Sequence, residues 1–317
     1  MRRIRLTVAY DGTAYSGWQQ QKNGNGIENK LNEALSELCR EPIAVIGASR
    51  TDAGVHALGN IAVFDTESRI PAEKFAPAVN QYLPEDIRIR RSEACDPDWH
   101  PRHMEGMKVY EYKIYNERIQ NPLWRLYAHH CYYPLSLGAM RAAAEYLIGE
   151  HDFTSFANPD SQVLQKGGSA VRKLYDVTIL VEHGRRYEPA EGQSLDHTGM
   201  QQEEYTDESA LEHGGTAHFT GIRKENSQGP GEMQTVGAEG TRELVRPRGY
   251  YGMITIRVSG SGFLYNMVRI IAGTLLEVGM GHYEPSHIQE ILKAKDRRLA
   301  GPTAEAKGLC LMKLEYR

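Results

Sequence analysis

Two kinds of apolar periodicity alternate along this chain, and this alternation limits the folds that it can adopt. In the segment Ile4–Tyr10 apolar residues occupy every second position, which is typical of a half-buried strand. Between Ile27 and Leu38 they recur at the spacing of one helix face. Hairpin-length spacings with helices on one side favour an α+β fold, with a central mainly antiparallel mixed sheet flanked by helices, over a doubly wound parallel sheet.

The same rhythm occurs in both parts of the chain. We expect strands near residues 4–10, 43–46, 60–64, 87–89, 109–115, 173–181, 252–258 and 309–315, and helices near 27–38, 71–83, 136–148, 263–278 and 285–294. The 317 residues exceed the usual size of one domain, roughly 100 to 200 residues. We therefore predict two similar α/β halves, over residues 1–105 and 106–317.

The stretch between His183 and Pro247 differs from everything around it, with ten glycines and little apolar periodicity. Residues 184–248 hold 7 Lys and Arg against 12 Asp and Glu, which leaves 30 against 29 in the remainder of a chain whose net charge is −4. Such a composition buries too little apolar surface to form a core, so we predict a mobile insertion at about 184–248. The near-neutral remainder can still present a basic face to nucleic acid where its arginines cluster.

Several classes of site and location are disfavoured by the sequence. The four cysteines, at positions 39, 95, 131 and 310, form no Cys-x-x-Cys, and no histidine pair has metal-ligand spacing, so we expect no metal and no disulfide. No Walker loop or dinucleotide fingerprint is present, which disfavours a site for a nucleotide of either class. Met1–Arg5 leads directly into a strand, and no apolar run is long enough for a membrane helix, so we expect a cytoplasmic protein without a membrane partner.

The loop Ala48–Ala57 places an arginine, a carboxylate, a glycine and a histidine between two expected strands. A turn in which the Asp or Thr makes local backbone hydrogen bonds is the ordinary interpretation of such a loop. However, this loop resembles the signature of the tRNA pseudouridine synthase A (TruA) family, and further segments that resemble family landmarks follow the chain order. They are Tyr10–Gln19, Asn80–Pro84, Trp99–Arg102, Lys108–Tyr112, Gly149–Phe156 and Gly262–Arg269.

The resemblance covers Met1–His183 and Gly249–Arg317. Trp99 and Pro101 depart from the more familiar phenylalanine and alanine, and the insertion is a larger departure. The resemblance implies the pseudouridine synthase catalytic fold, with two similar halves around an active-site cleft. It also implies a homodimer that isomerises uridine to pseudouridine at positions 38 to 40 of the tRNA anticodon stem-loop, without a cofactor.

The resemblance also assigns three catalytic residues. Asp52 is the nucleophile, which must be ionised to react. Arg269 is its ion-pairing partner, although an ordinary surface arginine on an amphipathic helix is the alternative. Tyr110 stacks on the uracil and takes part in the final removal of a proton from carbon, although a core tyrosine in an alternating strand is the alternative.

Four further residues are candidates for RNA contacts. The target base must be extruded from its stack before Asp52 can reach the sugar. The planar guanidinium of Arg50 suits the vacated space and can also bond phosphate. His56, His100 and Arg102 are carried as further substrate contacts, although a histidine near a site is often only a structural hydrogen-bonding group.

Two other functions remain open at this point. One is a catalytically silent tRNA-binding module of the same fold, against which the presence of Asp52, Tyr110 and Arg269 argues. The other is a hydrolase of the glycosidase type, which needs two suitably separated acids, and the sequence indicates no second acid near Asp52.

Overall fold

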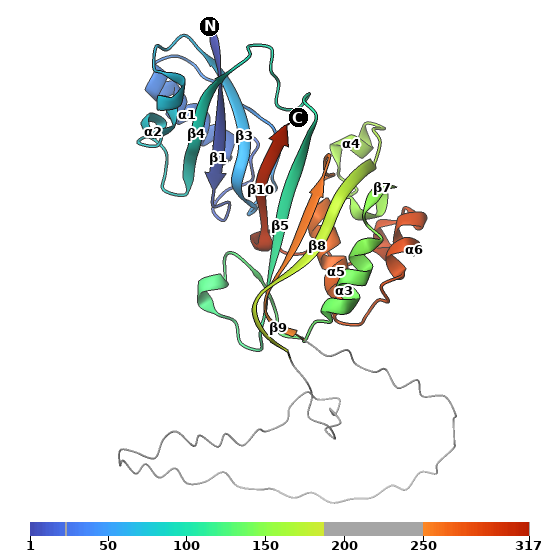
Figure 1. Ribbon diagram of the computed structural model, residues 1–317. Helices are drawn as coiled ribbons and strands as arrows, with labels where there is room; N and C mark the ends of the chain where they lie inside the picture. The colour runs from blue at the N-terminus through green and yellow to red at the C-terminus, as the bar shows by residue number, and fades with distance from the viewer. Residues whose placement is uncertain (23, 187–249, 317) are drawn as a thin grey trace, which may run out of the picture. The chain divides into compact units, whose positions relative to one another are not determined.

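The computed structural model describes residues 1–22, 24–186 and 250–316, and its described strands form one ten-stranded sheet (Figure 1). The strands are β1 (Arg2–Tyr10), β2 (Ile46–Gly47), β3 (His56–Thr66), β4 (Ile87–Cys95), β5 (Gly106–Asn116), β6 (His129–Cys131), β7 (Gly149–Asp152), β8 (Val171–Arg186), β9 (Tyr250–Gly260) and β10 (Leu309–Tyr316). Their order is β4-β1-β3-β10-β5-β9-β8-β7, with β2 on β3 and β6 on β5.

The sheet is mixed and mainly antiparallel. Among the described strands, only the pairs β10–β3 and β5–β6 are parallel. The α+β prediction is therefore confirmed. The last strand, β10, pairs with β3 on one side and with β5 on the other, so it joins the strands of the N-terminal and C-terminal parts. The division into halves at residue 105 stays a prediction.

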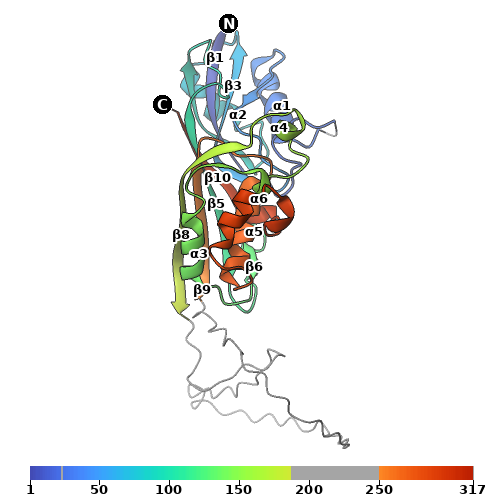
Figure 2. The same cartoon turned by 90° about the vertical axis from the view of Figure 1, so that its right-hand side faces the viewer.

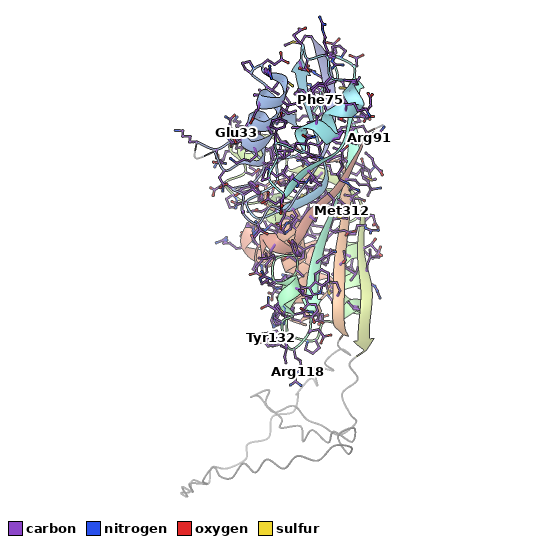
Figure 3. The ribbon with its side chains drawn as sticks, turned by 90° about the vertical axis from the view of Figure 1, so that its left-hand side faces the viewer. Glu33, Phe75, Arg91, Arg118, Tyr132 and Met312 are labelled. Carbon is purple, nitrogen blue, oxygen red and sulfur yellow. The ribbon has the colours of Figure 1, made fainter. Side chains whose placement is uncertain are left out.

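Six α-helices flank the described part of the sheet. They are α1 (Ile27–Cys39), α2 (Phe75–Val79), α3 (Leu137–Glu145), α4 (Gln162–Gln165), α5 (Met267–Gly279) and α6 (His287–Ala294). Phe75 of α2, labelled in Figure 3, belongs to the first turn of this helix. It meets Phe64 of β3 edge to face at 5.3 Å, which ties the helix to the sheet. Helices α3, α5 and α6 lie together beside the strands of the C-terminal part (Figure 2).

Helix α5 is buried around most of its circumference. One side faces α3 and β5, and the segment between α6 and β10 crosses the other. A Cβ atom at Gly273 would lie 1.9 Å from the carbonyl oxygen of Pro302, so only glycine allows this close crossing. The crossing segment is held by hydrogen bonds from Gly301 N to Thr274 Oγ1 and from Ala304 N to the carbonyl oxygen of Arg269.

The expected elements are present, with corrections at their ends. The strand expected at 43–46 is reduced to β2, and the second helix begins after Pro71 as a short 3-10 turn, Ala72–Lys74. The helix expected from residue 263 begins only at Met267, because Asn266 is left-handed, with φ of 61°. A left-handed residue cannot form part of a right-handed α-helix, so residues 263–266 lie outside α5.

Residues 184–186 of the predicted insertion belong to strand β8, which corrects its start, and residues 187–248 lie outside the described residues. Strands β8 and β9 pair up to Arg186 and Tyr250, so the chain leaves the sheet and returns to it at neighbouring positions. None of the helices that the structure describes is long and apolar enough to cross a membrane.

Candidate active site

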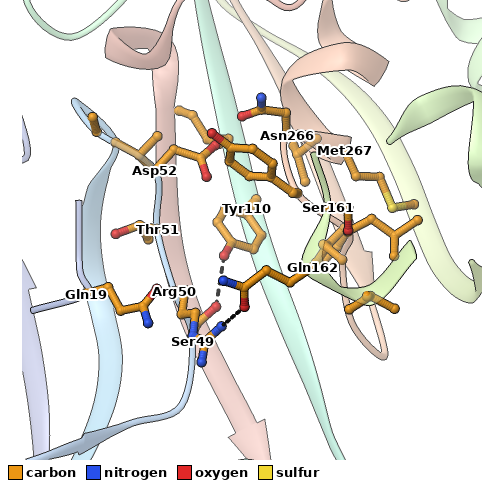
Figure 4. A pocket seen from close by; sticks show the side chains of 18 of the residues that line it. Gln19, Ser49, Arg50, Thr51, Asp52, Tyr110, Ser161, Gln162, Asn266 and Met267 are labelled. Atoms are coloured by element: carbon orange, nitrogen blue, oxygen red, sulfur yellow. Dashed lines mark hydrogen bonds between the residues drawn. The ribbon is translucent and has the colours of Figure 1, made fainter. Parts of the chain in front are cut away.

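A cavity of about 700 Å³ lies beside the loop that follows β2 (Figure 4). Its walls come from that loop, from the beginning of β5, from the beginning of α4 with the residues before it, and from residues 263–268 before and within α5. Four of the residues predicted for the site line it: Arg50, Asp52, Arg102 and Tyr110. The topology therefore brings together segments that are far apart in the sequence.

The loop that carries Asp52 is fixed by buried hydrogen bonds from neighbouring strands. Asn60 of β3 is fully buried and donates to the carbonyl oxygen of Ser49 at 3.0 Å. The hydroxyl of Tyr10 lies 2.7 Å from that of Thr51, and the backbone N–H of Trp18 donates to the Thr51 carbonyl. Buried polar groups with satisfied hydrogen bonds hold one conformation, so the carboxylate is presented by a rigid loop.

Asp52 and Arg269 form an ion pair, with 3.6 Å between Asp52 Oδ2 and Arg269 Nη1. Both side chains are largely buried, with exposed fractions of 21% and 17%. Burial raises the pKa of Asp52, and the positive charge of Arg269 opposes that rise. The guanidinium is itself anchored, because Nε donates to the Ala304 carbonyl at 2.7 Å and Nη1 donates to Asn266 Oδ1 at 3.2 Å.

Tyr110 forms part of the cavity wall opposite this pair. Its ring meets Phe263 edge to face at 5.2 Å, and its hydroxyl lies 3.0 Å from Ser49 Oγ. Burial raises the pKa of Tyr110 to about 12, so its hydroxyl is protonated at neutral pH. The two aromatic residues offer an apolar platform with one polar atom.

Arg50 and Arg102 lie on the solvent side of the cavity. Arg50 is exposed and donates from Nη1 to Gln162 Oε1 at 3.2 Å, which links the loop of Asp52 to α4 (Figure 4). Arg102 is exposed and donates from Nε to the Gly47 carbonyl at 2.8 Å. Both guanidinium groups keep further N–H donors for a ligand, since each has five.

The two predicted histidines are not among the residues that line this cavity. His56 is buried: its Nδ1 accepts from Gly12 N at 3.1 Å, and its Nε2 lies 3.1 Å from the Leu126 carbonyl. His100 stacks on His103 with ring centroids 4.0 Å apart, and its Nδ1 accepts from Arg102 N. Their roles as RNA contacts stay predictions, and the geometry of His56 is that of a structural group.

Lys108 lines the cavity but was not singled out from the sequence. Its Nζ lies 3.4 Å from Ser49 Oγ and 3.5 Å from the Ala48 carbonyl. Burial, with a further contribution from the positive charges of Arg102 and Arg172, lowers the pKa of Lys108 to about 8. The sequence did contain a sign that Lys108 belongs to the site. Residues two apart on a strand share a face, which places Lys108 beside Tyr110.

Comparisons with known proteins agree on one family. The model of a family described as tRNA pseudouridine synthase matches residues 6–103 and 143–317. Curated proteins named tRNA pseudouridine synthase A are similar over the whole chain. One from Exiguobacterium sp. is 37% identical over 100% of this chain and 98% of its own length, and one from Ruminiclostridium cellulolyticum is 37% identical over 100% of both. One from Thermoanaerobacter sp. is 35% identical, again over 100% of both chains.

The lowered pKa of Lys108 predicts a stability effect with a definite sign. The folded protein binds this proton less tightly than the unfolded chain, so Lys108 destabilises the fold below about pH 8, and the penalty fades as the pH rises from there toward 10.5. We expect Lys108→Met to raise the free energy of unfolding at pH 7 by about 1 to 3 kcal/mol, a gain that shrinks toward pH 10. Urea unfolding at both pH values measures it.

The exposed Lys293 of α6 provides the control, since Lys293→Met should change the free energy of unfolding by less than about 0.5 kcal/mol at either pH. A Lys108→Met protein that is less stable than the wild type at pH 7 would contradict this assignment.

Proposed function

Because the chain belongs to the tRNA pseudouridine synthase family and is thus an isomerase, we propose that it converts uridine to pseudouridine at positions 38 to 40 of the tRNA anticodon stem-loop. Asp52 is the proposed nucleophile. The observation that carries this proposal is the Asp52–Arg269 ion pair beside a cavity walled by Tyr110. The bond between the ribose C1′ and N1 breaks, the uracil turns while bound, and a bond forms between C1′ and C5. No net oxidation or reduction occurs.

The ion pair supplies what a carboxylate nucleophile requires. Burial alone would favour the protonated, unreactive acid, whereas Arg269 favours the ionised form. Opposite charges about 4 Å apart attract by roughly 4 kcal/mol in a partly shielded site, and desolvation of both groups offsets much of this. The remaining effect of Arg269 is to keep a largely buried carboxylate ionised at neutral pH. The anchors at Ala304 and Asn266 keep the guanidinium in place throughout.

The other cavity residues fit the substrate of this reaction. The apolar platform of Tyr110 and Phe263 suits a uracil ring that must turn about, because stacking imposes little directional constraint. Arg50 lies at the open side of the cavity, where its guanidinium can fill the space that the extruded base leaves. Extrusion of the base itself costs a few kcal/mol. Arg102 and His100 are the proposed neighbouring RNA contacts. His56 is the least suited of these residues to contact RNA, because both of its ring nitrogens already have partners inside the protein.

The alternative of a catalytically silent tRNA-binding module is disfavoured because a buried ion pair with two further anchors serves RNA affinity poorly. The hydrolase alternative gains one feature from the structure, since Asp160 also lines the cavity. Asp160 is exposed, however, and an acid that donates a proton to a leaving group usually has its pKa raised by burial.

We further propose that the protein acts as a cytoplasmic homodimer.

We predict that Asp52→Asn abolishes pseudouridine formation, because the amide is neutral and a poor nucleophile. Binding of tRNA should persist, since most affinity for RNA comes from phosphate contacts away from this carboxylate. The measurement is tritium release from tRNA labelled at carbon 5 of uridine, beside filter binding with the same folded protein.

Asp160→Asn makes the same chemical change at the rim of the same cavity and should leave tritium release intact. Substantial release by Asp52→Asn would refute the nucleophile, and free uracil among the wild-type products would instead indicate a hydrolase.

We also predict that Arg50→Ala lowers single-turnover rates far more than tRNA affinity, because one phosphate contact is a small share of an extended interface, whereas extrusion of the base is obligatory. Arg50→Lys keeps the charge but loses the planar group, so it should remain slow. Equal losses of rate and affinity in Arg50→Ala, with recovery of both in Arg50→Lys, would reduce Arg50 to a phosphate contact.

A further inference from the structure

Three polar side chains form a continuous path from the cavity wall into the sheet. The Tyr110 hydroxyl lies 3.0 Å from Ser49 Oγ, and Ser49 Oγ lies 3.4 Å from Lys108 Nζ (Figure 4 shows the first of these contacts). Ser49 is buried and belongs to the same rigid loop as Asp52. Tyr110 and Lys108 are two residues apart on β5 and share one face. The hydroxyl of Ser49 therefore connects the phenol of Tyr110 to the amine of Lys108.

The surroundings of Lys108 lower its affinity for a proton. Among the described residues, no Asp or Glu forms an ion pair with it, whereas Arg102 from the preceding loop and Arg172 from β8 are the charged groups that act on it most strongly. On the side of β10, Glu315 is paired with Lys313. An amine near two guanidinium groups and without a carboxylate paired to it loses its proton more readily than a free lysine.

Lys108 also lines a second cavity of about 270 Å³, next to the first. Its walls include Arg102, Ser261, Glu315 and Tyr316. A proton that arrives at Lys108 can therefore leave by a space other than the one that holds the substrate. The path begins at Tyr110 and ends at Lys108, which borders both cavities.

The proposed reaction needs such an acceptor in its last step. Once carbon 5 is bonded to the ribose, it still carries the hydrogen that uridine had there, and this hydrogen must leave as a proton. The Tyr110 hydroxyl is already protonated, so it can accept the proton only if it passes its own proton onward. In the described wall of the cavity, the hydrogen-bond partner of that hydroxyl is Ser49.

We propose that Lys108, acting through Ser49, is the terminal proton acceptor for Tyr110 when carbon 5 is deprotonated, an inference that rests on the proposed function. The carbon–hydrogen bond breaks and its electron pair forms the C5=C6 double bond. The electron pair of the C6=N1 double bond moves to N1, and N1 takes a proton from water. The carbon proton passes to Tyr110 Oη, the phenol proton to Ser49 Oγ, and the serine proton to the neutral Nζ of Lys108. The ammonium then releases a proton to water in the second cavity.

The alternative role for Lys108 is a cation that binds an RNA phosphate together with Arg102. The relay is favoured because Nζ already lies near Ser49 and the Ala48 carbonyl inside the protein, and because a lowered proton affinity weakens a phosphate site. The two roles predict opposite behaviour for Lys108→Arg. Arginine keeps the charge for phosphate but does not become neutral in a protein, so it cannot accept the proton.

The test compares wild type, Lys108→Met, Lys108→Arg and Ser49→Ala in single turnovers with tRNA that carries hydrogen or deuterium at carbon 5 of its uridines, from pH 6 to 9. We expect wild-type proton removal to become faster with pH up to about 8 and then to level off. All three variants should be slower, on the order of a hundredfold, with a deuterium isotope effect and no dependence on pH over this range. Binding of tRNA should change little.

Two results would overturn the relay: wild-type rates with no new isotope effect in both Lys108→Met and Ser49→Ala, or a normal rate restored by Lys108→Arg together with weakened tRNA binding in Lys108→Met. Thermal unfolding of each variant identifies any that fails to fold, and the Lys108 and Ser49 variants test the path independently. Failure of the proposed function is a separate observation, because it requires the wild type to form no pseudouridine.

Discussion

The attraction between Arg269 and Asp52 is the constraint on which the rest of the site depends. The arginine comes from α5 and the aspartate from the loop before β3, so the pair connects two distant parts of the chain. Without the guanidinium, burial would raise the pKa of the carboxyl further and favour its protonated form. The ion pair is therefore better explained as a means of holding charge in the proposed catalytic cavity than as a source of stability, since burying a pair of charges often gives little net gain.

The scaffold around this pair is built to keep its members from moving. The crossing over Gly273 places the Ala304 carbonyl where Arg269 Nε can donate to it, and a larger residue at position 273 would push that carbonyl away. On the other side, Asn60 holds the loop of Asp52 through the Ser49 carbonyl. Strand β10 joins the two groups of strands between them. Rigid elements thus fix both charges before substrate arrives, which lowers the reorganisation needed during reaction.

Much of the fold follows from periodicity in the sequence, whereas several features of the site do not. Alternation in β1 and helical spacing in α1 are local patterns, and both elements lie where the patterns place them. The start of α5 was misplaced because the left-handed backbone at Asn266 has no signal in an apolar run. The charges that act on Lys108 come from Arg102 in the preceding loop and from Arg172 of β8. Only the order of strands in the sheet brings Arg172 near it. The burial of His56 likewise arises from tertiary packing.

The most direct measurement of the central claim is the ionisation of Asp52 in the free protein. Carboxyl signals of isotope-labelled protein, assigned by their loss in Asp52→Asn, report its pKa in the wild type, in Arg269→Lys and in Arg269→Met. We predict an ionised carboxyl at pH 7 in the wild type, and a higher pKa in Arg269→Met, because burial then acts unopposed. Arg269→Lys should lie between them. An Asp52 pKa that is the same in all three proteins would contradict the account.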